Sequence, residues 1–201
     1  MNSRFCLVAA AVVAAGACAP ARSENPTLDK FSRIIGTNDL KYYDVEGRTP
    51  GDVAKSMQEL GPETNEFFGH PQASYSATWH KRNEGAGRCD LLSVQVTTAS
   101  RMMLPRWTPP ADTAPGASAE WQRFMSALQR HQVEHKRISD RGARQLLDGL
   151  LGLKTFCSEV PRDVKRLTDS INVQTQNRQA AYDRRTHRGG TQGAVFLAWL
   201  P

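Results

Sequence analysis

The sequence predicts an α+β fold in which a small antiparallel sheet packs on two long helices. Polar and apolar residues alternate along 73–81 and 89–103, which is the pattern of half-buried strands. Apolar residues recur at helical spacing along 119–150 and again along 158–182. The chain of 201 residues is 23% charged and 39% hydrophobic, a balance typical of one globular domain.

The first half of the folded chain is expected to form the sheet and one short helix. Residues 41–45 begin a strand-like run, and turn-forming residues then lead into a helix over 52–60. The two alternating segments, 73–81 and 89–103, are joined by a turn at 83–87. We therefore expect them to pair as a hairpin with one buried face.

The second half is expected to be helical. Residues 108–118 are rich in Pro, Ala and Gly and predict an irregular connection, after which Ser118 caps the first long helix. The second long helix is expected to begin at Ser158 with Pro161 in its first turn, because proline is favoured there. A basic, glycine-rich tail over 184–193 leads into apolar residues that we expect to dock on the core.

The N-terminus has the pattern of an export signal. Arg4 precedes an apolar stretch over 5–17 that is too short for a comfortable membrane span, and small residues follow it. Two kinds of processing remain open. One is cleavage after a small residue near 21–23, and the other is lipidation of Cys18, whose preceding residues resemble a bacterial lipobox.

These observations divide the chain into a signal peptide (1–21), a tether (22–40) and a single exported domain (41–201). We expect the domain to be periplasmic, secreted or lipid-anchored, with membrane contact only through such an anchor. The net charge of +6 comes from 26 basic and 20 acidic residues, and the arginines are scattered along the chain. Without a groove-reading motif, this charge does not predict nucleic-acid binding.

Cysteine usage agrees with export. Cys6 leaves with the signal and Cys18 is removed or lipid-modified, so Cys89 and Cys157 are the cysteines of the folded domain. In an oxidising compartment, two cysteines favour one disulfide. Two separate buried thiols are the alternative.

The sharpest chemical feature is the run His131-Gln132-Val133-Glu134-His135 within the first long helix. Residues four apart lie about 40° from each other around a helix, so both imidazoles can face one metal ion. Zinc is the expected ion because it accepts neutral imidazole nitrogen. The alternative is a surface helix on which both histidines and Glu134 are solvated.

The order of residues within this run bears on catalysis. In the familiar zinc-protease helix a glutamate base follows the first histidine, and here that position is Gln132, whose amide cannot take a proton from zinc-bound water. Glu134 lies on the mirror flank of the histidine pair. Zinc peptidases with the inverted order use that flank, so Glu134 is the candidate general base.

Several separated segments point to one bacterial family. They are Tyr42-Tyr43-Asp44-Val45-Glu46-Gly47, Leu60-Gly61-Pro62, Ala77-Thr78-Trp79, Cys89, Leu104-Pro105-Arg106-Trp107, Trp121-Gln122-Arg123-Phe124, Tyr182-Asp183-Arg184-Arg185-Thr186, Gly189 and Thr191-Gln192-Gly193-Ala194. With these segments in order over residues 40 to 195, the chain resembles the family called domain of unknown function 922. That family is described as predicted secreted zinc-dependent proteases.

The resemblance implies a zincin-like helix with a His-Glu-x-x-His motif, here at His131, Gln132 and His135, and a later histidine beside a glycine. The sequence departs from this pattern at Gln132 and at His187, which stands one residue before the expected place. From the resemblance we expect zinc to be held by His131, His135 and His187.

The leading functional hypothesis is a zinc-dependent, metallopeptidase-like protein of the envelope that acts on a peptide or protein substrate, with Glu134 as base. The main alternative is a catalytically inactive family member that serves as an envelope binding or structural module. A non-catalytic metal-binding protein is the third hypothesis.

Overall fold

The computed structural model describes residues 32–61 and 72–199. The expected signal peptide (1–21), the lipidation candidate Cys18 and most of the expected tether therefore lie outside the described residues. None of the described helices combines the length and hydropathy that a bilayer-spanning segment needs.

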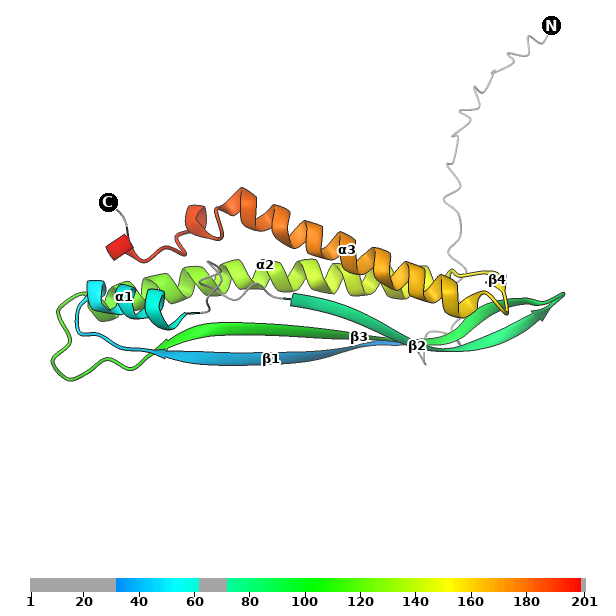
Figure 1. The fold of residues 1–201 in the computed structure, drawn as a ribbon, viewed down its shortest axis with the longest axis horizontal. Coiled ribbons are helices and arrows are strands. Elements are labelled where there is room, and N and C mark those ends of the chain that lie inside the picture. The colour runs from blue at the N-terminus through cyan, green and yellow to red at the C-terminus, as the bar shows by residue number, and fades with distance from the viewer. Residues whose placement is uncertain (1–31, 62–71, 200–201) are drawn as a thin grey trace, which may run out of the picture.

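Three main strands and three helices make a mixed α/β structure, in which α2 and α3 lie along one face of the sheet (Figure 1). The elements are β1 (Arg33–Val45), α1 (Pro50–Leu60), β2 (Gln72–Gly85), β3 (Arg88–Trp107), α2 (Ala117–Leu151), β4 (Thr155–Phe156), α3 (Val160–Thr186) and the short 3-10 helices η1 (Gly190–Gln192) and η2 (Leu197–Trp199). The expected helices and the expected hairpin are confirmed.

The sheet is mixed rather than antiparallel, which corrects the expectation from sequence. β3 is central and pairs antiparallel with β2 but parallel with β1. β2 and β3 are joined by a tight turn at Ala86 and Gly87, both with positive φ, so this pair has to be antiparallel. The connection from β1 to β3 contains α1 and all of β2, and a long crossover of this kind allows parallel pairing.

β1 is longer than the predicted strand and takes in part of the expected tether. Residues 33–40 pair in register with Gln95–Met102, whereas the sequence reading placed them in the segment before the fold. Nearly every side chain of β1 is exposed, because the strand lies at the edge of the sheet. Its sequence therefore lacks the alternation by which a half-buried strand is recognised.

The helix starts differ in how well the sequence predicted them. α1 begins at Pro50, two residues before the predicted start, with a capping box between Thr49 and Asp52. Pro161 stands in the first turn of α3, as expected. The prediction that Ser118 caps α2 is wrong. The N-cap is Gly116, which has a φ of 85° and contributes no side-chain hydrogen bond.

The core consists of two apolar clusters separated by a polar layer. One cluster gathers α1, the first part of α2 and the C-terminal segment, and includes Val53, Met57, Trp107, Phe124, Leu128 and Phe196. The other lies beneath the hairpin and includes Leu91, Val94, Val96, Leu146, Leu150 and Val164. Between the clusters, α2 and α3 bury Ile138 together with a group of polar residues: His131, Gln132, His135, Ser139, Thr175 and Gln179. Buried polar groups require hydrogen-bond partners, so this layer is where specific chemistry is expected.

The predicted disulfide is confirmed. Cys89 and Cys157 are bonded, with their Cα atoms 4.9 Å apart. Cys157 directly follows β4, which pairs with the start of β3. The bond therefore ties the connection between α2 and α3 to the sheet at the end occupied by the second cluster.

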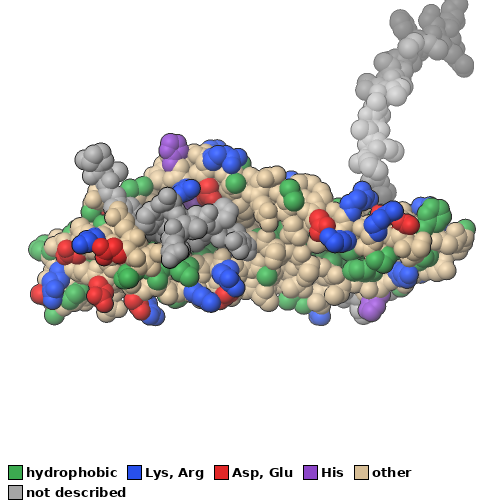
Figure 2. All heavy atoms as spheres, in the orientation of Figure 1, with side chains coloured by type: hydrophobic (Ala, Val, Ile, Leu, Met, Phe, Trp, Pro, Cys, Tyr) green, Lys and Arg blue, Asp and Glu red, His purple; other side chains and the backbone are tan. Residues whose placement is uncertain are grey.

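The visible face in Figure 2 carries basic and acidic side chains that are interspersed rather than separated. Across the described residues, several exposed charged side chains form ion pairs between neighbouring elements or within one helix, such as Arg106 with Asp44 and Lys165 with Asp169. Exposed pairs of this kind contribute little to stability, typically about 0–1 kcal/mol each.

Substitution of Gly142 by alanine is expected to destabilise the fold. A Cβ there would lie 2.4 Å from both the Thr175 Oγ1 and the Tyr75 hydroxyl, and that hydroxyl is fixed by donating to the Ser139 carbonyl. Overpacking of this kind costs about 1–3 kcal/mol, and the roughly 1 kcal/mol that alanine gains over glycine in a helix offsets only part of that range. Chemical denaturation measures the difference.

Gly149→Ala in the same helix is the matched control. Its Cβ would meet only the flexible end of the Leu167 side chain, so this variant should be close to neutral or slightly stabilising. Equal effects of the two substitutions would contradict the proposed close approach at Gly142.

Candidate metal centre

Three ligand atoms from two helices converge in the polar layer. The Nε2 atoms of His131 and His135 lie 3.1 Å apart, and the Asp183 Oδ1 lies 3.2 Å from the first and 2.8 Å from the second. Ligand atoms at about 2.0–2.1 Å from a tetrahedral ion are about 3.3 Å apart, so this triangle has the dimensions of a coordination site. These three residues could hold a metal ion.

The helices bring the three side chains together from positions far apart in the sequence. The two histidines are one turn apart on α2, as their spacing predicts, and Asp183 comes from the last turn of α3, which packs against α2. His131 and His135 are only 2% and 1% exposed, and the Asp183 side chain is 15% exposed. The cluster is thus largely shielded from solvent.

His135 is held in one orientation by Gln179. The Gln179 amide nitrogen donates to the His135 carbonyl at 3.0 Å and to the Ser139 hydroxyl at 3.0 Å, so its amide oxygen is the end that faces the His135 Nδ1. An amide oxygen can only accept, so the proton of this hydrogen bond lies on Nδ1. The tautomer is assigned from the hydrogen-bond network in this way.

His131 is held in the corresponding way by Gln192 of η1. The Gln192 Oε1 accepts from the His131 Nδ1 at 2.9 Å and from the Tyr182 hydroxyl at 3.0 Å. The Tyr182 ring stacks on the His131 imidazole with the centroids 4.8 Å apart, and burial raises the pKa of the Tyr182 hydroxyl. Tyr182 therefore remains a neutral donor to Gln192 at neutral pH.

With both Nδ1 atoms donating, the lone pairs of both Nε2 atoms point at each other and at a carboxylate oxygen. Three electron-rich atoms at about 3 Å repel one another unless a positive charge lies among them. A metal ion supplies that charge, and so does an added proton on one imidazole. The arrangement of a ligating imidazole whose other nitrogen donates to a protein oxygen is the usual one around bound metals.

The glycine-rich tail explains how η1 comes so close to His131. A Cβ at Gly189 would lie 3.1 Å from the His131 Cγ and 2.9 Å from the Ala194 Cβ, and Gly189 has a φ of 87°. Only glycine combines this backbone conformation with so close an approach.

The third atom of the cluster belongs to Asp183, and His187, which the resemblance implies as a ligand, is not among the three residues that could hold a metal. His187 is exposed and forms the C-cap of α3 with a φ of 49°, so the helix ends before it. Had the helix continued, His187 would have lain one turn beyond Asp183 on that face. The spacing of Gln179, Tyr182 and Asp183 on one helix face is the signal that could have identified Asp183.

Glu134, the candidate base, does not belong to the cluster. Its carboxylate pairs with Arg141 at 3.1 Å and with Arg137 at 3.3 Å, and the hydrogen bond from Arg141 is the main cause that lowers the Glu134 pKa. Gln132 is buried beside the histidine pair. The usual base position of the motif is therefore occupied by the amide of Gln132. The position on the other side of the histidine pair is occupied by the carboxylate of Glu134, which is ion-paired.

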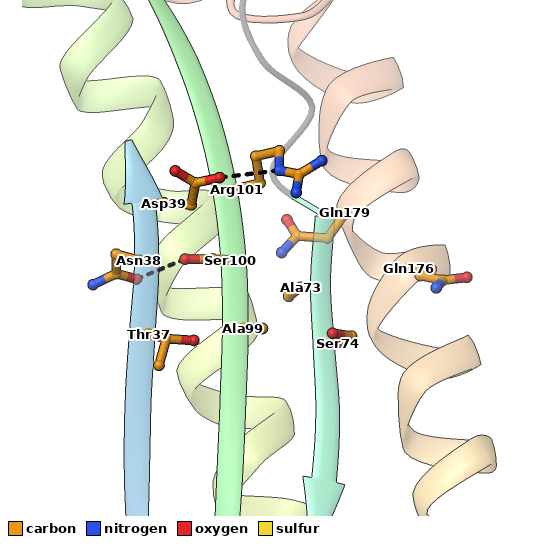
Figure 3. A pocket seen from close by; sticks show the side chains of 10 residues that line it. All are labelled: Thr37, Asn38, Asp39, Ala73, Ser74, Ala99, Ser100, Arg101, Gln176 and Gln179. Carbon is orange, nitrogen blue, oxygen red and sulfur yellow. Dashed lines mark hydrogen bonds and ion pairs between the residues drawn. The ribbon is translucent and has the colours of Figure 1, made fainter. Parts of the chain in front are cut away.

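A polar groove of about 780 Å³ is lined by the sheet and α3 (Figure 3). Residues of β1, β2, β3 and α3 line it, among them Asn38, Ser100, the ion-paired Asp39 and Arg101, and Gln179. Gln179 is the residue that this groove shares with the hydrogen-bond network of His135. The groove thus contacts a residue that hydrogen-bonds to His135, and its lining includes none of His131, His135 and Asp183.

The family described as "Bacterial protein of unknown function (DUF922)" matches residues 40–190, which include the cluster and the disulfide. No curated protein and no solved structure matches the chain.

Proposed function

Because the chain belongs to this family of bacterial proteins of unknown function, we propose its function from the site itself. The protein holds one zinc ion through His131, His135 and Asp183, on a zincin-like helix, and does so without peptidase activity. It acts in the bacterial envelope as a metal-containing binding or structural module.

The main evidence for this proposal is the convergence of three ligand atoms, two of which belong to imidazoles that are already oriented by hydrogen bonds to glutamine side chains. Both imidazoles donate through Nδ1 to amide oxygens, which leaves both Nε2 atoms and the Asp183 oxygen directed at one point. Solvated surface histidines would have neither the burial nor the partners found here.

Zinc is proposed because the ligand set is the one it favours. Two imidazoles and one carboxylate bind zinc in known metallopeptidases and leave a fourth position open. The same set also binds iron(II) in some oxygenases, so elemental analysis has to identify the metal.

The absence of peptidase activity is proposed from the two flanks of the histidine pair. Zinc peptidases need a carboxylate that accepts a proton from metal-bound water. The amide of Gln132 cannot do this, and Glu134 is occupied by Arg137 and Arg141, which stabilise its charged form. Deprotonated and ion-paired, Glu134 is a weak base for this step.

Zinc-loaded protein is accordingly expected to contain about one zinc per chain and to leave a peptide library uncut. Gln132→Glu is the variant that restores a carboxylate at the base position, and general-base catalysis is worth about 10²–10⁴-fold in rate. Mass spectrometry of the peptides after long incubation, with and without a chelator, measures this.

Chelator-sensitive cleavage by the unmodified protein, lost on Glu134→Gln, would overturn the proposed inactivity and make Glu134 the base. Failure to retain any divalent metal after loading and gel filtration would overturn the metal site itself. Iron in place of zinc would reassign the ion and leave the ligand residues as proposed.

A further inference from the structure

We propose that Gln179 and Gln192 are positioning residues of the metal centre, whose amide oxygens hold the two imidazoles with Nε2 directed at Asp183. The inference rests on the proposed metal site and deepens it. Neither residue contributes an atom to the triangle of ligand atoms, and each acts through one histidine.

The chemistry of an amide oxygen suits this role. It accepts the Nδ1–H hydrogen bond and has no basicity with which to remove that proton, so each imidazole is kept in the tautomer that ligates through Nε2. Residues that orient metal-binding histidines in this way typically contribute 10–100-fold to metal affinity.

The two glutamines are anchored differently. Gln179 is buried, and its amide nitrogen is fixed by the His135 carbonyl and the Ser139 hydroxyl. Gln192 lies on an exposed turn, where its oxygen is shared between His131 and the Tyr182 hydroxyl. Substitution of Gln192 therefore removes a hydrogen bond to His131 without opening a cavity in the core.

The turn that carries Gln192 is tied to α2 by further contacts. The Arg123 guanidinium donates to the Gly193 carbonyl at 2.8 Å, and Glu120 accepts from the Leu197 backbone N–H at 2.6 Å. These contacts do not involve the Gln192 side chain. The turn is therefore expected to keep its position in a Gln192 variant, so that the variant removes only the hydrogen bonds of the Gln192 oxygen to His131 and Tyr182.

The experiment compares Gln192→Leu, Gln192→Glu and Gln176→Leu in the purified full-length protein. Leucine removes the acceptor, and glutamate restores an acceptor of the same length. Gln176 is the matched control, because it is an exposed glutamine one turn before Gln179 on α3. Two quantities are measured: the Nδ1–H resonances of 15N-labelled histidine in metal-free protein, and the zinc dissociation constant.

In the unmodified protein, both His131 and His135 should carry a slowly exchanging Nδ1 proton even without metal. Gln192→Leu should lose that signal for His131 only and weaken zinc binding about 10–100-fold. Gln192→Glu should restore both, and Gln176→Leu should change neither. Apo-protein melting temperatures should agree among the variants, which separates positioning from a general loss of structure.

The two measurements distinguish failure of this inference from failure of the proposed function. Retention of the His131 Nδ1 proton and of full zinc affinity in Gln192→Leu would overturn the positioning role while leaving the zinc site standing. The opposite result is also possible to recognise: the unmodified protein binds no zinc, both Nδ1 protons are present, and Gln192→Leu loses the His131 proton. This result would overturn the zinc site and uphold the orientation of the rings by the amides.

Discussion

Asp183→Asn is expected to abolish stoichiometric zinc binding while the protein remains folded. The asparagine side chain has the same shape but lacks the charge that balances the ion, and Asp183 is the carboxylate of the cluster. Zinc at 100 times its dissociation constant should stabilise the unmodified protein by about 2.7 kcal/mol. Thermal melts with and without zinc, together with calorimetric titration, should show that this stabilisation is lost in the variant.

Asp169→Asn is the control for this experiment. Asp169 lies on the same helix, is exposed and pairs with Lys165, so its substitution should leave zinc binding unchanged. His187→Ala should likewise bind zinc normally, because His187 is the exposed C-cap residue of α3. Loss of zinc in His187→Ala with full affinity in Asp183→Asn would show that the third ligand is His187 and that the assignment to Asp183 is wrong.

Removal of the disulfide is expected to have the largest effect on stability. Cys89 and Cys157 are 68 residues apart, and closing a loop of this length stabilises the folded state by about 4 kcal/mol through the entropy of the unfolded chain. The double substitution Cys89→Ala and Cys157→Ala avoids burying a hydroxyl at position 89, which is 3% exposed. Urea denaturation of both proteins measures the difference in unfolding free energy.

The metal centre provides an internal control for the disulfide variant. The bond belongs to the second apolar cluster, which contacts the C-terminal part of α2, whereas the histidines lie nearer the middle of that helix. The folded variant should therefore bind zinc with unchanged affinity. Free thiols at Cys89 and Cys157 in denatured, non-reduced protein, or an unfolding free energy equal to that of the variant, would contradict the prediction.

Local features of the chain were predictable from its sequence because they depend on neighbours within a few residues. The four-residue spacing of His131 and His135 places both rings on one helix face whatever packs against it. The hairpin of β2 and β3 follows from two alternating segments around a glycine turn. The disulfide followed from the number of cysteines in the folded domain.

Other features depended on contacts that no local pattern contains. β1 is an exposed edge strand, so neither its first residues nor its parallel pairing with β3 leaves a periodic trace in the sequence. The family resemblance placed the third ligand at a histidine near the end of α3. It could not anticipate that the helix ends at Thr186 and that His187 is its exposed C-cap residue.

The sequence by itself thus determined the helical histidine pair and the cross-link. Only the tertiary structure decided that Asp183 completes the cluster and that Gln179 and Gln192 orient its imidazoles. The physical reason is the register of α3 against α2. It brings the Asp183 Oδ1 to 2.8 Å from the His135 Nε2, although the two residues are 48 positions apart in the sequence. That register is set by the packing of the apolar cluster beneath the hairpin and by the disulfide beside β4, which are properties of the folded chain as a whole.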